Sequence, residues 1–101
     1  MENSLLHHIF ENHKGKGNPV TSADLEKIFE VKGADLRTVI RGLRRKGIPI
    51  GSSVRGYFYC ITEDEYDHLT SDLRSRAFSM LETVKLLEKT KHFQKEQICW
   101  Q

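Results

Sequence analysis

Apolar residues recur at helical spacing near the start of the chain, which predicts a first helix over residues 4–13. We expect Asn3 or Ser4 to cap its N-terminus. Two glycines and a proline between residues 14 and 19 interrupt the pattern and end the helix. The side chains expected on its buried face are Leu5, Leu6, Ile9 and Phe10.

Two further short helices follow. The first opens at Thr21, which stands in capping-box spacing with Asp24, and it is expected to end near residue 30. The second is predicted over residues 34–46, and Gly47 suits the position just past a helix C-terminus. A projection at 100° per residue gathers one apolar face on this second helix, formed by Leu36, Val39, Ile40 and Leu43.

The pattern then changes to the alternation that is typical of strands. An extended run over residues 48–53, a turn at 54–56 and a run of β-formers at 57–61 predict a small antiparallel hairpin. The side chains placed on one face of the second strand are Tyr57, Tyr59 and Ile61, and we expect the two tyrosines to close the core. A base-stacking platform is the alternative role for Tyr57, Phe58 and Tyr59.

A long helix is predicted from residue 63 to about residue 94. Thr62 and Glu65 form a capping box, and neither Pro nor Gly occurs after Gly56. The apolar stripe is too long for a head of about 60 residues to cover, so we expect a homodimer through this helix, with folding back on its own domain as the alternative. The dimerisation residues would be Tyr66, Leu69, Leu73, Ala77, Met80, Val84 and Leu87.

These elements predict a mainly α fold with a small β-hairpin, in the α+β class. We expect two parts, a head over residues 1–61 and a long C-terminal helix over residues 62–101 that dimerises or docks on a partner. A chain of 101 residues has room for one hydrophobic core without disulfide support.

Positive charge is concentrated in the middle of the chain. Residues 32–56 carry seven basic side chains and one acidic, a net charge of +6, whereas residues 1–31 and 57–101 each carry a net charge of −2. Such a distribution is typical of a face that binds a polyanion, and a solvated helix surface is the alternative.

The face of helix 34–46 opposite its apolar residues combines small, hydroxyl and arginine side chains. Ala34 and Thr38 permit close approach, and Arg41 and Arg45 can reach guanine edges or phosphates in a DNA major groove. The full set of predicted DNA-contacting residues is Lys32, Ala34, Arg37, Thr38, Arg41, Arg44, Arg45, Lys46, Ser52 and Arg55.

The order of these pieces resembles a winged helix-turn-helix, with the nearest likeness in the biotin-repressor-like "type 11" group. The resemblance covers about residues 4–61 and rests on segments 20–25, 31–37, 40–50 and 55–59. In that family, Leu-Arg-x-x-Gly-x-Pro-Ile followed by Gly-Tyr marks the exit of the recognition helix and the return strand of the wing. The resemblance implies double-stranded DNA binding by helix 34–46, with a wing at 51–57. Lys32-Gly33 departs from the Ser or Thr that the family usually places before the recognition helix.

Other chemistry finds little support in the sequence. The five histidines lack zinc-site spacing, and no catalytic triad or cofactor motif is visible, so we expect no metal, no cofactor, no small-molecule ligand and no enzymatic activity. Two cysteines, Cys60 and Cys99, suit a reducing compartment, and neither a signal peptide nor a membrane span is visible.

The expected protein is therefore a cytoplasmic, nucleoid-associated transcriptional regulator or mobile-element factor. The alternative is an adaptor of a replication or phage complex that uses the winged helix as a scaffold.

Overall fold

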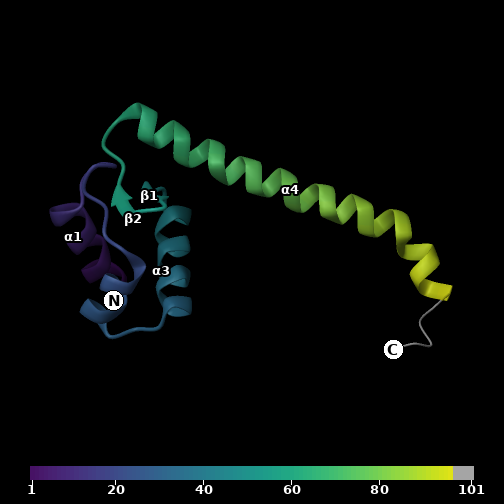
Figure 1. Cartoon of the computed structure of the whole chain (residues 1–101), viewed down its shortest axis with the longest axis horizontal. Helices are drawn as coiled ribbons and strands as arrows, with labels where there is room; N and C mark the ends of the chain where they lie inside the picture. The colour runs from purple at the N-terminus through teal and green to yellow at the C-terminus, as the bar shows by residue number, and fades with distance from the viewer. Residues whose placement is uncertain (97–101) are drawn as a thin grey trace. The chain divides into compact units, whose positions relative to one another are not determined.

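The computed structural model describes residues 1–96, with side chains described as far as residue 91. Within this range the chain is mainly helical, with a small antiparallel hairpin and a long last helix (Figure 1). Cys99 lies outside the described residues. The elements are α1 (Glu2–Asn12), α2 (Ser22–Phe29), α3 (Gly33–Arg45), β1 (Ile50–Ser53), β2 (Gly56–Tyr59) and α4 (Glu63–Glu96).

The chain divides into two compact units, Met1–Thr70 and the residues from Ser71 onward. The boundary falls inside α4, whereas the sequence pattern placed it before the helix, at residue 61. The reason is that Glu65 and Leu69 bind the first turns of α4 to the head through contacts described below.

Helix α1 begins two residues earlier than its pattern predicts. Met1 occupies the N-cap position without a side-chain hydrogen bond, so the prediction that Asn3 or Ser4 caps the helix is wrong. Glu2 stands in the first turn, where the helix dipole favours a carboxylate, and its carboxylate pairs with Lys46 at the end of α3. These two interactions favour the earlier start.

Helix α2 has a side-chain cap at its start and a backbone motif at its end. The Thr21 hydroxyl accepts a hydrogen bond from the Asp24 N–H at 3.1 Å, as the capping-box spacing predicts. At the other end, Glu30 adopts a left-handed conformation with φ 52°, and the Val31 N–H donates to the Glu26 carbonyl at 3.1 Å. This is the Schellman arrangement, at a position where glycine is usual.

Strands β1 and β2 pair in register from Ile50 with Tyr59 to Ser53 with Gly56. The preceding chain adds backbone contacts to β2, because the Val20 N–H donates to the Tyr57 carbonyl and the Tyr57 N–H to the Val20 carbonyl, both at 2.8 Å. This approach requires Gly56, since a Cβ there would lie 2.2 Å from the Val20 oxygen and the residue has φ 131°.

The expected hairpin face is partly wrong. Tyr57 and Tyr59 pack against the main core as predicted, but Ile61 lies beyond the end of β2 and is 58% exposed. Strand β2 ends at Tyr59, and the segment that follows turns toward the start of α4. Side chains alternate between two faces only within a strand, so the alternation does not extend to Ile61.

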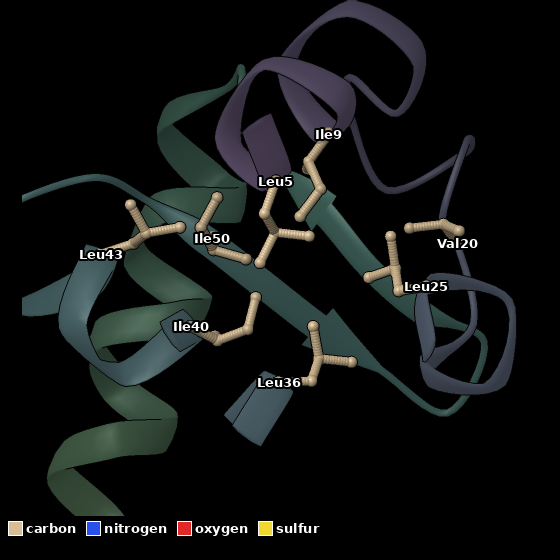
Figure 2. Close-up of a cluster of buried hydrophobic side chains, with 8 residues drawn as sticks. All are labelled: Leu5, Ile9, Val20, Leu25, Leu36, Ile40, Leu43 and Ile50. Carbon is tan, nitrogen blue, oxygen red and sulfur yellow. The ribbon is translucent and has the colours of Figure 1, made fainter. Parts of the chain in front are cut away.

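The main core lies between the three short helices and the hairpin (Figure 2). Helix α3 contributes three side chains to it, and α1 contributes two, so these helices are amphipathic elements that bury one face each. The residues of the cluster, shown together in Figure 2, are Leu5, Ile9, Val20, Leu25, Leu36, Ile40, Leu43 and Ile50.

A second, smaller cluster lies on the other face of β2 and was not predicted. Phe58 points away from Tyr57 and Tyr59, and its ring packs over Gly51, where a Cβ would lie 2.7 Å away. Cys60 and Leu69 complete this cluster. The first turns of α4 therefore share a hydrophobic contact with the hairpin.

Glu65 fixes the start of α4 to the head. The Thr62 hydroxyl accepts from the Glu65 N–H at 3.1 Å, as predicted. The Glu65 carboxylate accepts from the Ile61 N–H at 2.9 Å and, with its other oxygen, from the Lys16 N–H at 2.9 Å. Hydrogen bonds from Ile61 and then Lys16 lower the pKa of Glu65, because they stabilise the charged carboxylate.

The left-handed residue at the end of α2 yields a first prediction. Glu30→Gly should raise the free energy of unfolding by about 0.5–1 kcal/mol, because glycine adopts this conformation without the steric cost that a Cβ imposes. Urea denaturation of both proteins measures the difference. Glu30→Ala is the matched control and should leave stability close to that of the parent, and a glycine variant no more stable than the alanine variant would contradict this account.

The Glu65 contacts yield a second prediction. Glu65→Gln should lower the free energy of unfolding at pH 7 by about 1 kcal/mol, a modest value because the site is accessible to solvent. Since the pKa is lower in the folded state, the carboxylate stabilises the fold above its unfolded-state pKa of about 4.3, and this contribution is lost as the pH falls through the folded-state pKa. The gap between the two proteins should therefore close in acid, as measured by urea denaturation at several pH values. Asp64→Asn is the control, and a gap that is independent of pH would refute the assignment.

Candidate functional site

The outward face of α3 lies opposite the buried one. Leu36, Ile40 and Leu43 are at most 1% exposed and fix the rotation of the helix about its axis. The opposite positions are all exposed: Ala34, Thr38, Arg41 and Arg45. Two guanidinium groups, a small side chain and a hydroxyl thus share one side of α3.

Thr38 keeps a defined orientation on this face. Its hydroxyl donates to the Ala34 carbonyl one turn earlier, at 3.1 Å. The oxygen can still accept a hydrogen bond from a ligand, because that bond uses only its proton.

Lys32 is the exposed N-cap residue of α3 and makes no side-chain cap bond. A Cβ on the next residue, Gly33, would lie 3.3 Å from the Arg37 guanidinium and 3.4 Å from the Glu26 carboxylate. Gly33 therefore leaves room for these two groups, and Arg37 is exposed. Asp35 is exposed in the first turn.

Two basic residues at the end of α3 have partners inside the head. The Arg44 Nε–H donates to the Ile50 carbonyl at 2.7 Å and ties α3 to β1. The Lys46 ammonium pairs with the Glu2 carboxylate. Arg44 and Lys46 were predicted as phosphate contacts together with the outward arginines, but these contacts within the head give both residues a second role.

The hairpin turn presents another cation. Arg55 is exposed, and its N–H donates to the Ser53 hydroxyl at 3.2 Å. Val54 at the turn is fully exposed, and Ser52 is half-buried. An open recess of about 250 Å³ lies between residues 52–57 and the start of α2 at Thr21 and Ser22.

The head covers one residue of the predicted dimerisation stripe, and the others are exposed. Leu69 is 8% exposed and packs with Phe58 and Cys60, so its apolar surface is already covered. Alternation along β2 places Phe58 opposite the tyrosines, and this was the signal that could have found the contact. The other stripe residues are exposed: Tyr66, Leu73, Ala77, Met80, Val84 and Leu87.

Two of the remaining titratable groups have a shifted pKa, His8 and Cys60. Partial burial, and then the nearby His13 and His7, lower the pKa of His8, whose ring centroid lies 5.2 Å from that of His13. Burial raises the pKa of the Cys60 thiol. Among the described residues no group of three or more His, Cys, Asp or Glu side chains could hold a metal ion. Within the same part of the chain, no helix combines the length and the apolar character needed to cross a membrane.

Comparison of the chain with protein-family models, with curated proteins and with solved structures gives no match.

The different surroundings of two arginines on α3 yield a third prediction. Arg44→Ala should lower the free energy of unfolding by about 1–3 kcal/mol, because it leaves the Ile50 carbonyl without its charged donor. Arg41→Ala is the matched control on the same helix and should change stability by less than about 0.5 kcal/mol, since its side chain is exposed. Thermal or urea denaturation measures both. Equal losses of stability would contradict the division between inward and outward arginines.

Proposed function

We propose that this chain is a sequence-specific double-stranded DNA-binding protein that acts as a small transcriptional regulator. The observation that supports it most is the exposed face of α3, where Ala34, Thr38, Arg41 and Arg45 lie opposite a fully buried apolar face. An arginine-bearing helix with small residues near its start fits a major groove of about 12 Å width.

The head is consistent with a winged helix-turn-helix in which α3 is the recognition helix and the hairpin is the wing. Helices α2 and α3 are joined by three residues and contact each other. The backbone bonds between Val20 and Tyr57 add a third extended segment beside the hairpin. This arrangement supports the resemblance to the biotin-repressor-like group.

In the proposed complex, α3 lies in the major groove. Arg41 and Arg45 contact base edges, with guanine as the preferred partner because its O6 and N7 accept two hydrogen bonds from one guanidinium. Thr38 contacts a base through its hydroxyl or methyl group. Lys32 at the start of α3 and Arg55 in the wing contact phosphates on either side.

The contacts within the head reduce the number of phosphate-binding residues. Arg44 binds the backbone of β1, and Lys46 is paired with Glu2, so the main role of both residues is to hold parts of the head together. We therefore expect the salt dependence of binding to reflect about four basic side chains, rather than the six or so that the charge pattern alone indicates.

The exposed stripe of α4 supports homodimerisation. Leu73, Met80, Val84 and Leu87 are between 37% and 70% exposed and recur at spacings of three, four and seven. Pairing with a second copy would bury them and would bring two recognition helices to half-sites about one helical turn, ~34 Å, apart.

The same exposed stripe favours a second candidate function, in which α4 docks onto another protein and the head is a scaffold. This adaptor does not need the arginine face of α3. Binding of a random duplex at low salt distinguishes the two functions, because a DNA-binding protein retains a sequence-independent affinity that an adaptor need not have.

The proposed function yields a fourth prediction. Arg41→Ala should relax the sequence preference at one base pair, at a cost of about 1–3 kcal/mol for the preferred site, and Lys32→Ala should weaken binding to all duplexes alike. Selection from a randomised duplex pool, followed by anisotropy titrations with chosen and scrambled sites, measures both effects. Arg76→Ala is the control, because that residue lies on α4 and pairs with Asp72. Identical effects of the Arg41 and Lys32 variants would contradict the assigned roles.

A further inference from the structure

Helix α3 has two flanks of different charge beside its outward face. A projection at 100° per residue places Asp35, Gly42 and Lys46 together on one flank, within an arc of about 40°. The opposite flank carries Arg37 and Arg44, which are about 20° apart in the same projection. The arginine-bearing face lies between the two flanks, so each flank would stand near one phosphate-lined wall of a DNA groove that held α3.

The side chain of Glu2, in the first turn of α1, lies on the flank that contains Gly42. One of its carboxylate oxygens, Oε2, lies 3.5 Å from the position that a Cβ on Gly42 would occupy. The other oxygen, Oε1, pairs with the Lys46 ammonium. Because Gly42 has no side chain, a carboxylate contributed by α1 occupies this place on the surface of α3.

This contact changes the charge that the flank presents to a ligand. Glu2 balances the charge of Lys46, and Asp35 adds a second carboxylate in the first turn of α3. One cation and two carboxylates leave a net charge of −1 on this flank, whereas Arg37 and Arg44 give the opposite flank a charge of +2. Phosphates are therefore attracted to the Arg37 side of α3 and not to the Lys46 side.

The exposure of the ion pair shows that Lys46 is accessible to a ligand. The Lys46 side chain is 62% exposed, and that of Glu2 is 36% exposed. A duplex that recruits Lys46 must first separate it from Glu2, and the freed carboxylate then lies beside the phosphate backbone and repels it. An exposed ion pair shifts an equilibrium by at most about fivefold, so Glu2 weakens the phosphate contact of Lys46 by a factor of this order.

We propose that Glu2 is a positioning residue of the DNA-binding face, which holds Lys46 away from the phosphate backbone and so limits the sequence-independent affinity of the head. This inference rests on the proposed DNA binding and adds that α3 contacts the DNA backbone mainly on one side. Lower sequence-independent affinity leaves a larger share of the binding free energy to the base contacts of Arg41 and Arg45.

Anisotropy titrations of the full chain with a labelled random-sequence duplex, between 50 and 200 mM salt, test this role. Glu2→Gln should raise the affinity at 50 mM about two- to fivefold and steepen the slope of log K against log salt by about one, because Lys46 then contacts a phosphate. A purely structural ion pair predicts the reverse, since its loss would weaken the head and its binding. Glu11→Gln is the matched control, with the same change of charge on the opposite side of α1, and should leave the slope unchanged.

A double-mutant cycle tests whether the effect acts through Lys46. Lys46→Ala should change binding by the parent chain little, but it should remove the whole gain in the Glu2→Gln chain, and circular dichroism confirms that each variant keeps its helices. Three results would each overturn the inference and leave the proposed function intact: an unchanged slope in Glu2→Gln, an equal gain in Glu11→Gln, or a gain that persists in Glu2→Gln/Lys46→Ala. A parent chain that binds no duplex would overturn both.

Discussion

The burial of one face of α3 is the constraint on which the structure and its proposed function depend. Leu36, Ile40 and Leu43 are almost completely inaccessible, and they pack with side chains from α1, α2 and β1. Rotating α3 by one residue, about 100°, would expose these three apolar side chains to water and would bury guanidinium groups in the core. Each of the two changes costs several kilocalories per mole. Arg41 and Arg45 therefore face outward because the core requires it.

A second set of contacts makes the start of α4 part of the head. Leu69 joins Phe58 and Cys60, and Glu65 holds the loop at Lys16 through its carboxylate. These contacts end at Thr70, where the first compact unit ends. The apolar residues further along α4 are exposed, and they are the surface for which we propose self-association.

Much of the fold follows from local sequence signals. The Thr21 and Thr62 caps, Gly47 after α3, and the apolar face of α3 were all predictable, because capping and helical periodicity depend on residues within a few positions of each other. The start of α1 was missed, because its Glu2 contact involves a residue 44 positions away. Long-range bonds of this kind leave no periodic signal.

The candidate site could also be predicted only in part, because local periodicity does not show long-range contacts. Periodicity identified the outward arginines, but it did not show that Arg44 binds the Ile50 carbonyl or that Lys46 pairs with Glu2. It also placed Leu69 in a dimer stripe, although the residue packs under the hairpin. Sequence periodicity assigns a face of a helix, and only the fold determines which neighbour covers that face.

The salt dependence of duplex binding tests the central claim most directly. Anisotropy titrations of a labelled duplex between 50 and 200 mM salt should show the affinity falling by two orders of magnitude or more, with a slope of log K against log salt near −4, as expected when about four basic side chains release counterions from DNA. Replacing both Lys32 and Arg55, the proposed phosphate contacts, with alanine should reduce the slope by about two. An affinity that does not change with salt, or a slope that the double variant leaves unaltered, would contradict the account.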